Sequence, residues 1–140
     1  MVDYKEIASY AVILIIVLIA AQHLNVVVSG SMEPVFYRGD IVAIEKADFF
    51  GIHEFNVNDV KKGDIVVYDA AWFNQPVIHR IIDIKDINGT TMYVIKGDNN
   101  NRTDPYYVTA NQIESRVLTW GDKPIVIPWI GNISLWLRGL

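Results

Sequence analysis

VIHRIIDIKDINGTTMYVIK, residues 77–96, predicts a long antiparallel hairpin and, through it, the fold class. Residues 77–85 and 90–96 are rich in β-branched and aromatic side chains, which favour strands. Between them stands Asn88-Gly89, the dipeptide that best suits the two left-handed positions of a type I′ turn. Two such strands joined by two turn residues are typical of a β-hairpin.

This turn also predicts which residues oppose one another across the hairpin. If only the two turn residues form the loop, Ile87 pairs with Thr90. Counted outward, the same register places His79 opposite Asp98, with Cβ atoms about 4.5–5.5 Å apart. A bulge in either strand would shift the register, and Gly97 is a suitable bulge site.

Shorter strand-like segments on both sides of the hairpin extend the β prediction. The first two are each introduced by Gly-Asp, and the loop-like residues 47–63 between them are mixed in charge. The sequence contains no internal repeat, and it predicts a mainly β fold with one β domain over residues 25–124. The predicted strands outside the hairpin are residues 41–44, 64–68, 106–109 and 112–119.

The N-terminal part of the chain is apolar enough to span a membrane. Residues 7–32 contain no Asp, Glu, Lys or Arg, and we expect a transmembrane anchor over residues 7–24 after a short tail, residues 1–6. A cleavable signal peptide would have a basic start and a shorter apolar segment, and a buried helix apolar on all faces would need a larger protein. Lys5 before the helix and Arg38 after it nearly balance, so charge does not predict the orientation.

The C-terminal residues 125–140 are again apolar and include two tryptophans. Tryptophan suits the headgroup level of a bilayer, so one interpretation is a membrane-interfacial segment. A closing strand or helix of the β domain is the alternative.

Composition excludes several classes of function. A chain of 140 residues with a membrane anchor has room for one further domain. The net charge of −4 and the absence of Lys/Arg runs argue against nucleic acid as a partner. Without cysteine there is no thiol nucleophile or disulfide, and His23, His53 and His79 are scattered without metal-ligand spacing. We therefore expect no metal and no other cofactor.

A serine-containing turn between the anchor and the first strand suggests acyl-transfer chemistry. Val28-Ser29-Gly30-Ser31-Met32-Glu33-Pro34 places two hydroxyls beside a glycine that permits close approach of a substrate carbonyl. His79 is a candidate general base, and either Asp98 or Asp104 could orient it. An ordinary turn, a core histidine and turn-forming aspartates are the alternatives.

Several ordered motifs together resemble type I signal peptidases, above all the archaeal and endoplasmic-reticulum branch. The resemblance covers most of the chain. The block that holds lysine as the base in bacterial members of this family has His79 here, which is typical of the Ser-His-Asp branch. The motifs are SGSMEP at 29–34, Gly39-Asp40, KGDIVVY at 62–68, VIHRI at 77–81, KGDNN at 96–100 and TDP at 103–105.

The resemblance implies that Ser31 is the nucleophile, His79 the base and then the acid, and Asp104 the third member of a triad. Asp98 becomes a supporting residue. The hairpin register instead favours Asp98 as the neighbour of His79, and we side with Asp104 because the register assumes an unbulged hairpin. The Ser29 hydroxyl and the Ser31 N–H would bind the oxyanion.

The implied protein is a membrane-anchored serine endopeptidase with a coiled β-sheet catalytic domain on the extracytoplasmic side of the cell membrane. It would remove signal peptides from secretory preproteins after small residues, with association with the translocation machinery left open. A histidine base predicts that activity falls at low pH, below about 6.5 for a free imidazole. The alternatives are a membrane-tethered β module that only binds partners, and a self-cleaving Ser-Lys peptidase of the repressor type using Lys96 or Lys46.

Overall fold

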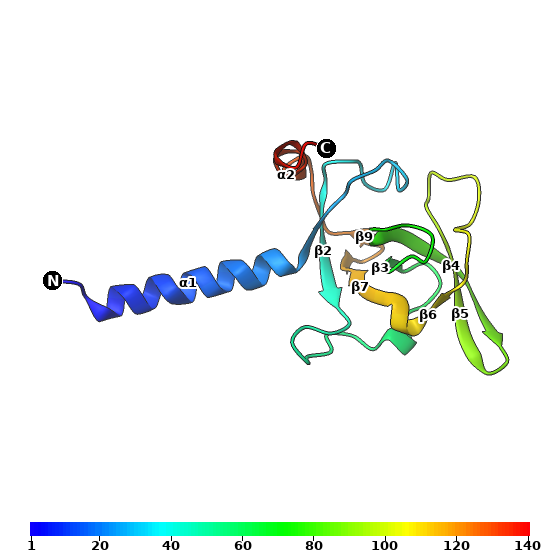
Figure 1. The fold of residues 1–140 in the computed structure, drawn as a ribbon, viewed down its shortest axis with the longest axis horizontal. Helices are drawn as coiled ribbons and strands as arrows, with labels where there is room; N and C mark the ends of the chain where they lie inside the picture. The colour runs from blue at the N-terminus through cyan, green and yellow to red at the C-terminus, as the bar shows by residue number, and fades with distance from the viewer.

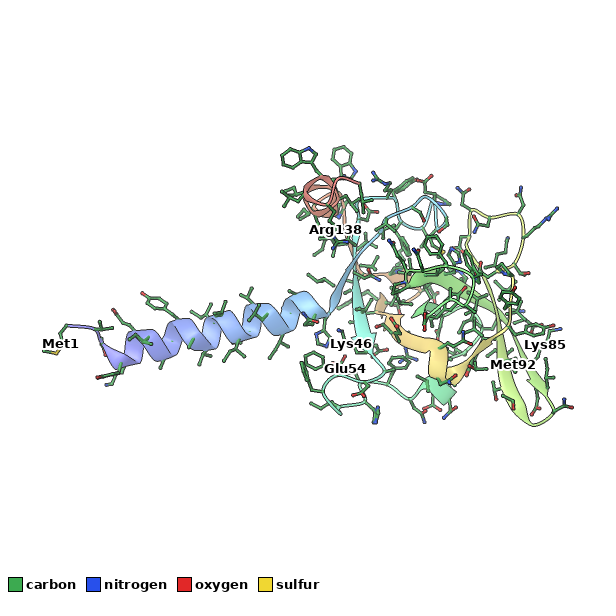
Figure 2. The ribbon with its side chains drawn as sticks, in the orientation of Figure 1. Met1, Lys46, Glu54, Lys85, Met92 and Arg138 are labelled. Atoms are coloured by element: carbon green, nitrogen blue, oxygen red, sulfur yellow. The ribbon has the colours of Figure 1, made fainter.

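The computed structural model describes residues 1–140 and shows one long helix joined end-on to a β domain (Figure 1). Helix α1, Tyr4–Gln22, begins earlier and ends earlier than the expected range 7–24. Asp3 caps it by accepting a hydrogen bond from the Lys5 N–H at 2.9 Å. None of its residues is buried, and its side chains project into open space (Figure 2). By length and composition it is apolar enough to cross a membrane.

The β domain is built around one antiparallel sheet of eight strands, so the expected mainly β fold with an N-terminal apolar helix is confirmed. The strands of this sheet are β1, Leu24–Val26; β2, Ile41–Lys46; β3, Ile65–Tyr68; β4, Val77–Ile87; β5, Thr90–Lys96; β6, Val108–Thr109; β7, Ile113–Val117; and β10, Val126–Ile127. Their order is β1-β2-β7-β3-β4-β5-β6, with β10 also paired to β2. A separate hairpin joins β8, Thr119–Trp120, to β9, Lys123–Pro124, and the short helices are η1, Val57–Asp59; η2, Ala110–Gln112; and α2, Gly131–Leu137.

Strand β2 changes partners along its length and thereby bends the sheet. Its first half, Ile41–Ala43, pairs with β1, whereas Ile44–Lys46 pairs with β7. A strand shared in this way forms a corner between two parts of a β structure. The segment leading from α1 through β1 is consequently brought beside the β3–β4 part of the sheet.

The β4–β5 hairpin has the predicted turn, but its register changes part-way along. Asn88 and Gly89 both have positive φ, 53° and 81°, as a type I′ turn requires. The predicted pairing holds from Ile87–Thr90 to Asp83–Val94, and then shifts between Asp83 and Ile81. The bulge lies in β4 and not at Gly97, so the predicted pairing of His79 with Asp98 is wrong. One extra residue in one strand displaces every later pair by one position.

Two buried clusters cover the two faces of β3 and fix the direction of the neighbouring side chains. Val66 and Tyr68 belong to one cluster, and Ile65 and Val67 to the other, because successive side chains of a strand point to opposite faces. In β4, Val77 and Ile81 join the first cluster, and His79 lies between them on the same face. The His79 side chain therefore lies on the same face of the sheet as Tyr68.

The junction between α1 and the β domain is held by His23, the residue that ends the helix. Its Nδ1 lies 2.8 Å from the Ile19 carbonyl, and its Nε2 lies 2.7 Å from a Glu54 carboxylate oxygen. The Ile19 carbonyl, with a smaller contribution from Glu54, raises the pKa of His23 against the opposing effect of burial. The Phe49 ring packs edge-on against the imidazole, with the ring centroids 4.8 Å apart.

Candidate active site

The serine turn lies in the connection between β1 and β2 and is fastened to the connection after β5. The Asn99 N–H donates to the Ser31 carbonyl at 2.8 Å, and the Asn99 side-chain amide donates to the Gly30 carbonyl at 3.0 Å. Met32, directly after Ser31, is fully buried. The Ser29 and Ser31 hydroxyls lie 3.1 Å apart. These contacts fix the Ser31 backbone while leaving its hydroxyl free to face β4.

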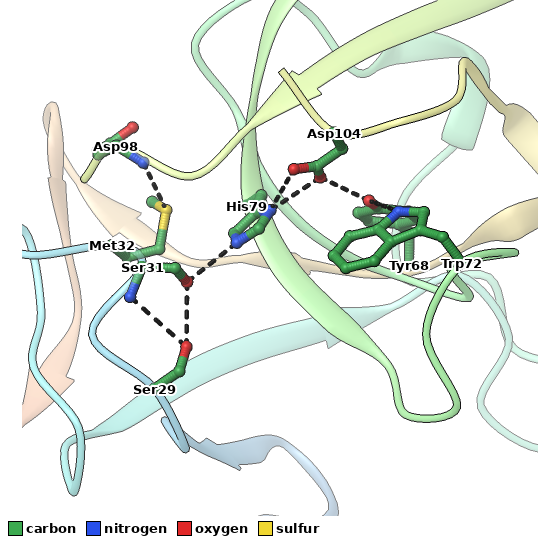
Figure 3. A network of polar contacts seen from close by, with 8 residues as sticks. All are labelled: Ser29, Ser31, Met32, Tyr68, Trp72, His79, Asp98 and Asp104. Carbon is green, nitrogen blue, oxygen red and sulfur yellow. Dashed lines mark hydrogen bonds and ion pairs between the residues drawn. The ribbon is translucent and has the colours of Figure 1, made fainter. Parts of the chain in front are cut away.

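The structure brings Ser31, His79 and Asp104 into one hydrogen-bonded row (Figure 3). The His79 Nε2 lies 2.9 Å from the Ser31 Oγ, and the His79 Nδ1 lies 2.8 Å from Oδ2 of Asp104. The His79 and Asp104 side chains are 5% and 3% exposed, so water scarcely competes for this contact. The row has the order hydroxyl, imidazole, carboxylate that an activated serine requires.

Asp104 reaches His79 from the long connection between β5 and β6. Its backbone N–H donates to the Ile95 carbonyl at 2.8 Å, which returns the connection to the end of β5. The Tyr68 hydroxyl lies 2.5 Å from Oδ2 of the same carboxylate, and the Trp72 Nε1 lies 3.3 Å from that hydroxyl. We did not single out Tyr68 or Trp72 from the sequence, because nothing local distinguishes Tyr68 from any buried strand aromatic.

Asp98 lies apart from His79, against Arg80. The Arg80 guanidinium donates to both Asp98 oxygens, with its NH2 group 2.7 Å from Oδ2. The hydrogen bonds to Asp98 raise the pKa of Arg80, although burial opposes them. The Arg80 NH1 group also donates to the Gly63 carbonyl at 2.9 Å. Arg80 thus ties Asp98, directly after β5, to the turn before β3.

Gly97 lets the strand end approach the serine and histidine closely. It is buried, and a Cβ atom there would lie 2.8 Å from the Ser31 carbonyl oxygen and 2.9 Å from the His79 Nε2. Any side chain at this position would therefore press on both groups. The sequence offered Gly97 as a bulge site, whereas the structure gives it the role of a close-approach residue.

A groove of about 740 Å³ passes over this row of residues. It is lined by Ser31 and His79 and also by Ala21 and Gln22, so it reaches from the candidate site to the last turn of α1. Both polar and apolar side chains line it. In the whole structure no group of three His, Cys, Asp or Glu side chains is placed to hold a metal ion.

The model of the signal peptidase family, peptidase S26, matches residues 2–102 of the chain. The chain belongs to this family. The resemblance seen in the sequence motifs is thereby confirmed. Membership of this signal peptidase family places the chain among the serine endopeptidases.

Proteins similar in sequence to this chain occur in archaea and in eukaryotes. The chain is 34% identical over 183 residues to an uncharacterized protein of Methanocaldococcus jannaschii, covering 89% of this chain and 88% of that protein. It is 34% identical over 122 residues to the signal peptidase complex catalytic subunit SEC11 of Lachancea thermotolerans, covering 80% of this chain and 64% of that subunit. It is 32% identical over 114 residues to the human signal peptidase complex catalytic subunit SEC11C, covering 79% of this chain and 54% of that subunit. The chain thus spans between about half and two thirds of the two eukaryotic subunits.

Proposed function

We propose that this chain is a membrane-anchored serine endopeptidase that removes signal peptides from secretory preproteins by cutting after small residues. The observation that carries the proposal is the row of Ser31, His79 and Asp104 at 2.9 and 2.8 Å, set in a groove that reaches the end of α1. The names of the SEC11 relatives, catalytic subunits of signal peptidase complexes, support the substrate class.

The chemistry follows from the order of the groups. Neutral His79 accepts the Ser31 proton at Nε2 while its Nδ1–H donates to Asp104, and the Ser31 oxygen attacks the scissile carbonyl. The oxyanion is bound by the Ser31 N–H and the Ser29 hydroxyl, and one such donor typically lowers the barrier by about 2.7–4 kcal/mol. The protonated imidazole then gives its proton to the departing amine. Water, deprotonated by the same histidine, then attacks the acyl carbonyl, and the imidazolium returns the proton to the Ser31 oxygen as the acyl–serine bond breaks.

Substrate selection depends on the strands that border the groove. An extended segment of the preprotein would lie along the backbone near β1 and the start of β4, which gives affinity through main-chain hydrogen bonds. Ile44, Val67 and Ile78 line the groove. We propose that these apolar side chains pack against the small residues before the cut.

Membrane attachment would hold the site where signal peptides emerge. We propose that α1 spans the cell membrane once, with the catalytic domain on the extracytoplasmic side and the lipid bilayer and the translocation machinery as neighbours. In Figure 1 helix α2 is seen end-on, above the point where the horizontal α1 ends, so the two axes are roughly perpendicular and α2 would lie along the membrane surface. Trp129 and Trp136 are 77% and 79% exposed, which supports interfacial contact of the C-terminal segment 125–140.

The decisive experiment compares the chain with its Ser31→Ala variant on a model preprotein in detergent micelles. The parent should release the mature protein at a small-residue site, and the variant should be slower by at least about a thousandfold. Equal processing by both would refute the nucleophile and the proposal with it. A binding module without catalysis predicts that neither cleaves and that both retain preprotein binding.

The same assay separates the Ser-Lys alternative. No hydrogen bond joins Ser31 to Lys46 or Lys96, and the Lys46 ammonium instead lies 3.5 Å from the Gln22 side-chain oxygen. We expect Lys96→Met and Lys46→Met to keep the parental kcat and the chain to remain uncut during turnover. Loss of turnover in either lysine variant, with the fold intact, would favour the lysine mechanism.

A further inference from the structure

The row of catalytic groups does not end at Asp104. The Tyr68 hydroxyl lies 2.5 Å from Oδ2, the same carboxylate oxygen that faces the His79 ring at 2.8 Å. Tyr68 is 1% exposed and does not line the groove, so a substrate cannot touch it. Figure 3 shows its hydroxyl on the side of Asp104 away from His79.

The direction of each hydrogen bond in this extension is fixed by chemistry. An indole N–H can only donate, so Trp72 donates to the Tyr68 hydroxyl at 3.3 Å. An ionised carboxylate can only accept, so the Tyr68 hydroxyl donates to Asp104. Burial, together with the hydrogen bond to Asp104, raises the pKa of Tyr68, which keeps the hydroxyl protonated. Tyr68 is therefore a permanent donor to Asp104.

Trp72 connects this extension to the substrate groove. It lies in the loop between β3 and β4, where its ring and that of Phe73 line the groove with centroids 5.7 Å apart. The base of the loop is anchored, since the Asp69 N–H donates to the Gln112 carbonyl at 2.8 Å. The Trp72 indole thus faces the substrate on one side and the Tyr68 hydroxyl on the other.

We propose that Tyr68 is a positioning residue that holds Asp104 against His79, and that Trp72 couples the substrate-facing β3–β4 loop to this carboxylate through Tyr68. The proposal rests on the proposed function, because it assigns Asp104 to the triad. A peptide packed on Trp72 presses the indole N–H toward Tyr68 and steadies Asp104 in the orientation that fixes the His79 tautomer. Binding of a peptide in the groove is thereby linked to the orientation and tautomer of His79, the proposed base.

The linkage has an electrostatic signature. The groups that face His79 are Ser31 from the β1–β2 connection and Asp104 from the β5–β6 connection, with Tyr68 of β3 behind the carboxylate. The Tyr68 donor draws part of the negative charge of Asp104 away from the imidazole. Removing the donor leaves more of that charge to stabilise the imidazolium. The base then becomes protonated at higher pH, and the carboxylate loses one of its two anchors.

The test uses Tyr68→Phe in the full-length chain, since this change removes the hydroxyl and keeps the buried ring. We expect kcat for preprotein cleavage to fall about tenfold or more with KM unchanged, as for the loss of a hydrogen bond to a charged group. The acid limb of the kcat/KM profile should move to higher pH. A merely structural role of Tyr68 would lower thermal stability without moving that limb.

Trp72→Phe tests the coupling by a double-mutant cycle. Alone, it should raise KM because its ring lines the groove, and it should also lower kcat severalfold because the indole N–H is lost. In the Tyr68→Phe background the kcat effect should disappear while the KM effect remains. Additive effects on kcat would refute the coupling through Tyr68.

An NMR titration of the histidine side chains reads the same contact without turnover. A His79→Gln variant identifies the His79 signal by its absence. The midpoint of that signal should lie at higher pH in Tyr68→Phe than in the parent. Superimposable titrations and pH profiles for parent and Tyr68→Phe would overturn the proposal. Because the titration does not need cleavage, a parent that fails to cleave would count against the proposed function and not against this contact.

Discussion

Replacing Gly97 by alanine is expected to impair catalysis by crowding two of the proposed catalytic groups at once. The added Cβ would lie 2.8 Å from the Ser31 carbonyl oxygen and 2.9 Å from the His79 Nε2. An ordinary carbon–oxygen contact is about 3.3–3.6 Å, so one of these groups must move by about 0.5 Å. The Ser31 carbonyl is held by the Asn99 N–H at 2.8 Å and cannot yield freely.

The magnitude follows from this displacement. Misplacing a reacting group by about 1 Å costs about a hundredfold in rate, so a shift of half that size should lower kcat about tenfold. Overpacking a buried site also costs about 1–3 kcal/mol of stability. A stability loss alone would not change kcat of the molecules that remain folded.

Gly89→Ala is the matched control for this experiment. Gly89 has a φ of 81° and no neighbouring atom within 4 Å, so alanine there is strained without touching the site. We expect it to lose a similar amount of stability, about 1–2 kcal/mol, and to keep the parental kcat. Both variants are compared by thermal unfolding and by the kinetics of preprotein cleavage in micelles. Parental kcat in Gly97→Ala would show that this close approach is not needed for catalysis.

Three further predictions follow from the site and its attachment. Asp98→Asn should lower the free energy of unfolding by about 1.5–3 kcal/mol with little effect on kcat, whereas Asp104→Asn should abolish turnover; the reverse pattern would exchange their roles. The raised pKa of His23 means that its contribution to stability is present at low pH and is lost as pH rises through that pKa. His23→Gln should therefore lower the melting temperature more at about pH 5.5 than at about pH 8.5, and an equal loss would contradict this. Trp129→Ser with Trp136→Ser should slow cleavage severalfold in lipid vesicles but not in micelles, and equal rates in vesicles would exclude interfacial contact.

Much of the fold could be predicted because its signals are local. The apolar N-terminal segment, the alternation of β-branched residues and the Asn88-Gly89 turn each depend on a few neighbouring residues. The register beyond the turn could not be predicted in the same way. The shift lies between Asp83 and Ile81, next to Arg80, where the pairing of β4 with β3 ends, and no local pattern encodes that long-range pairing.

The candidate site was predicted less directly. Residue types alone left Asp98 and Asp104 as alternatives, and only the family resemblance favoured Asp104. The structure places Asp104 beside His79 and Asp98 beside Arg80. A strand alternates its side chains with a period of two, so one bulge is enough to change which carboxylate a histidine meets.

The sequence by itself determined an apolar helix, a β domain and a serine, a histidine and two aspartates in order, because these depend on composition and short-range periodicity. Tertiary structure alone decided that Tyr68 and Trp72 continue the hydrogen-bonded row beyond Asp104. It also decided that residue 97 has no room for a side chain. Ser31, Tyr68 and Asp104 come from segments far apart in the chain. Their contacts, which include His79 of β4, exist only where the bent sheet brings two connections beside β3 and β4, and no local sequence pattern encodes that arrangement.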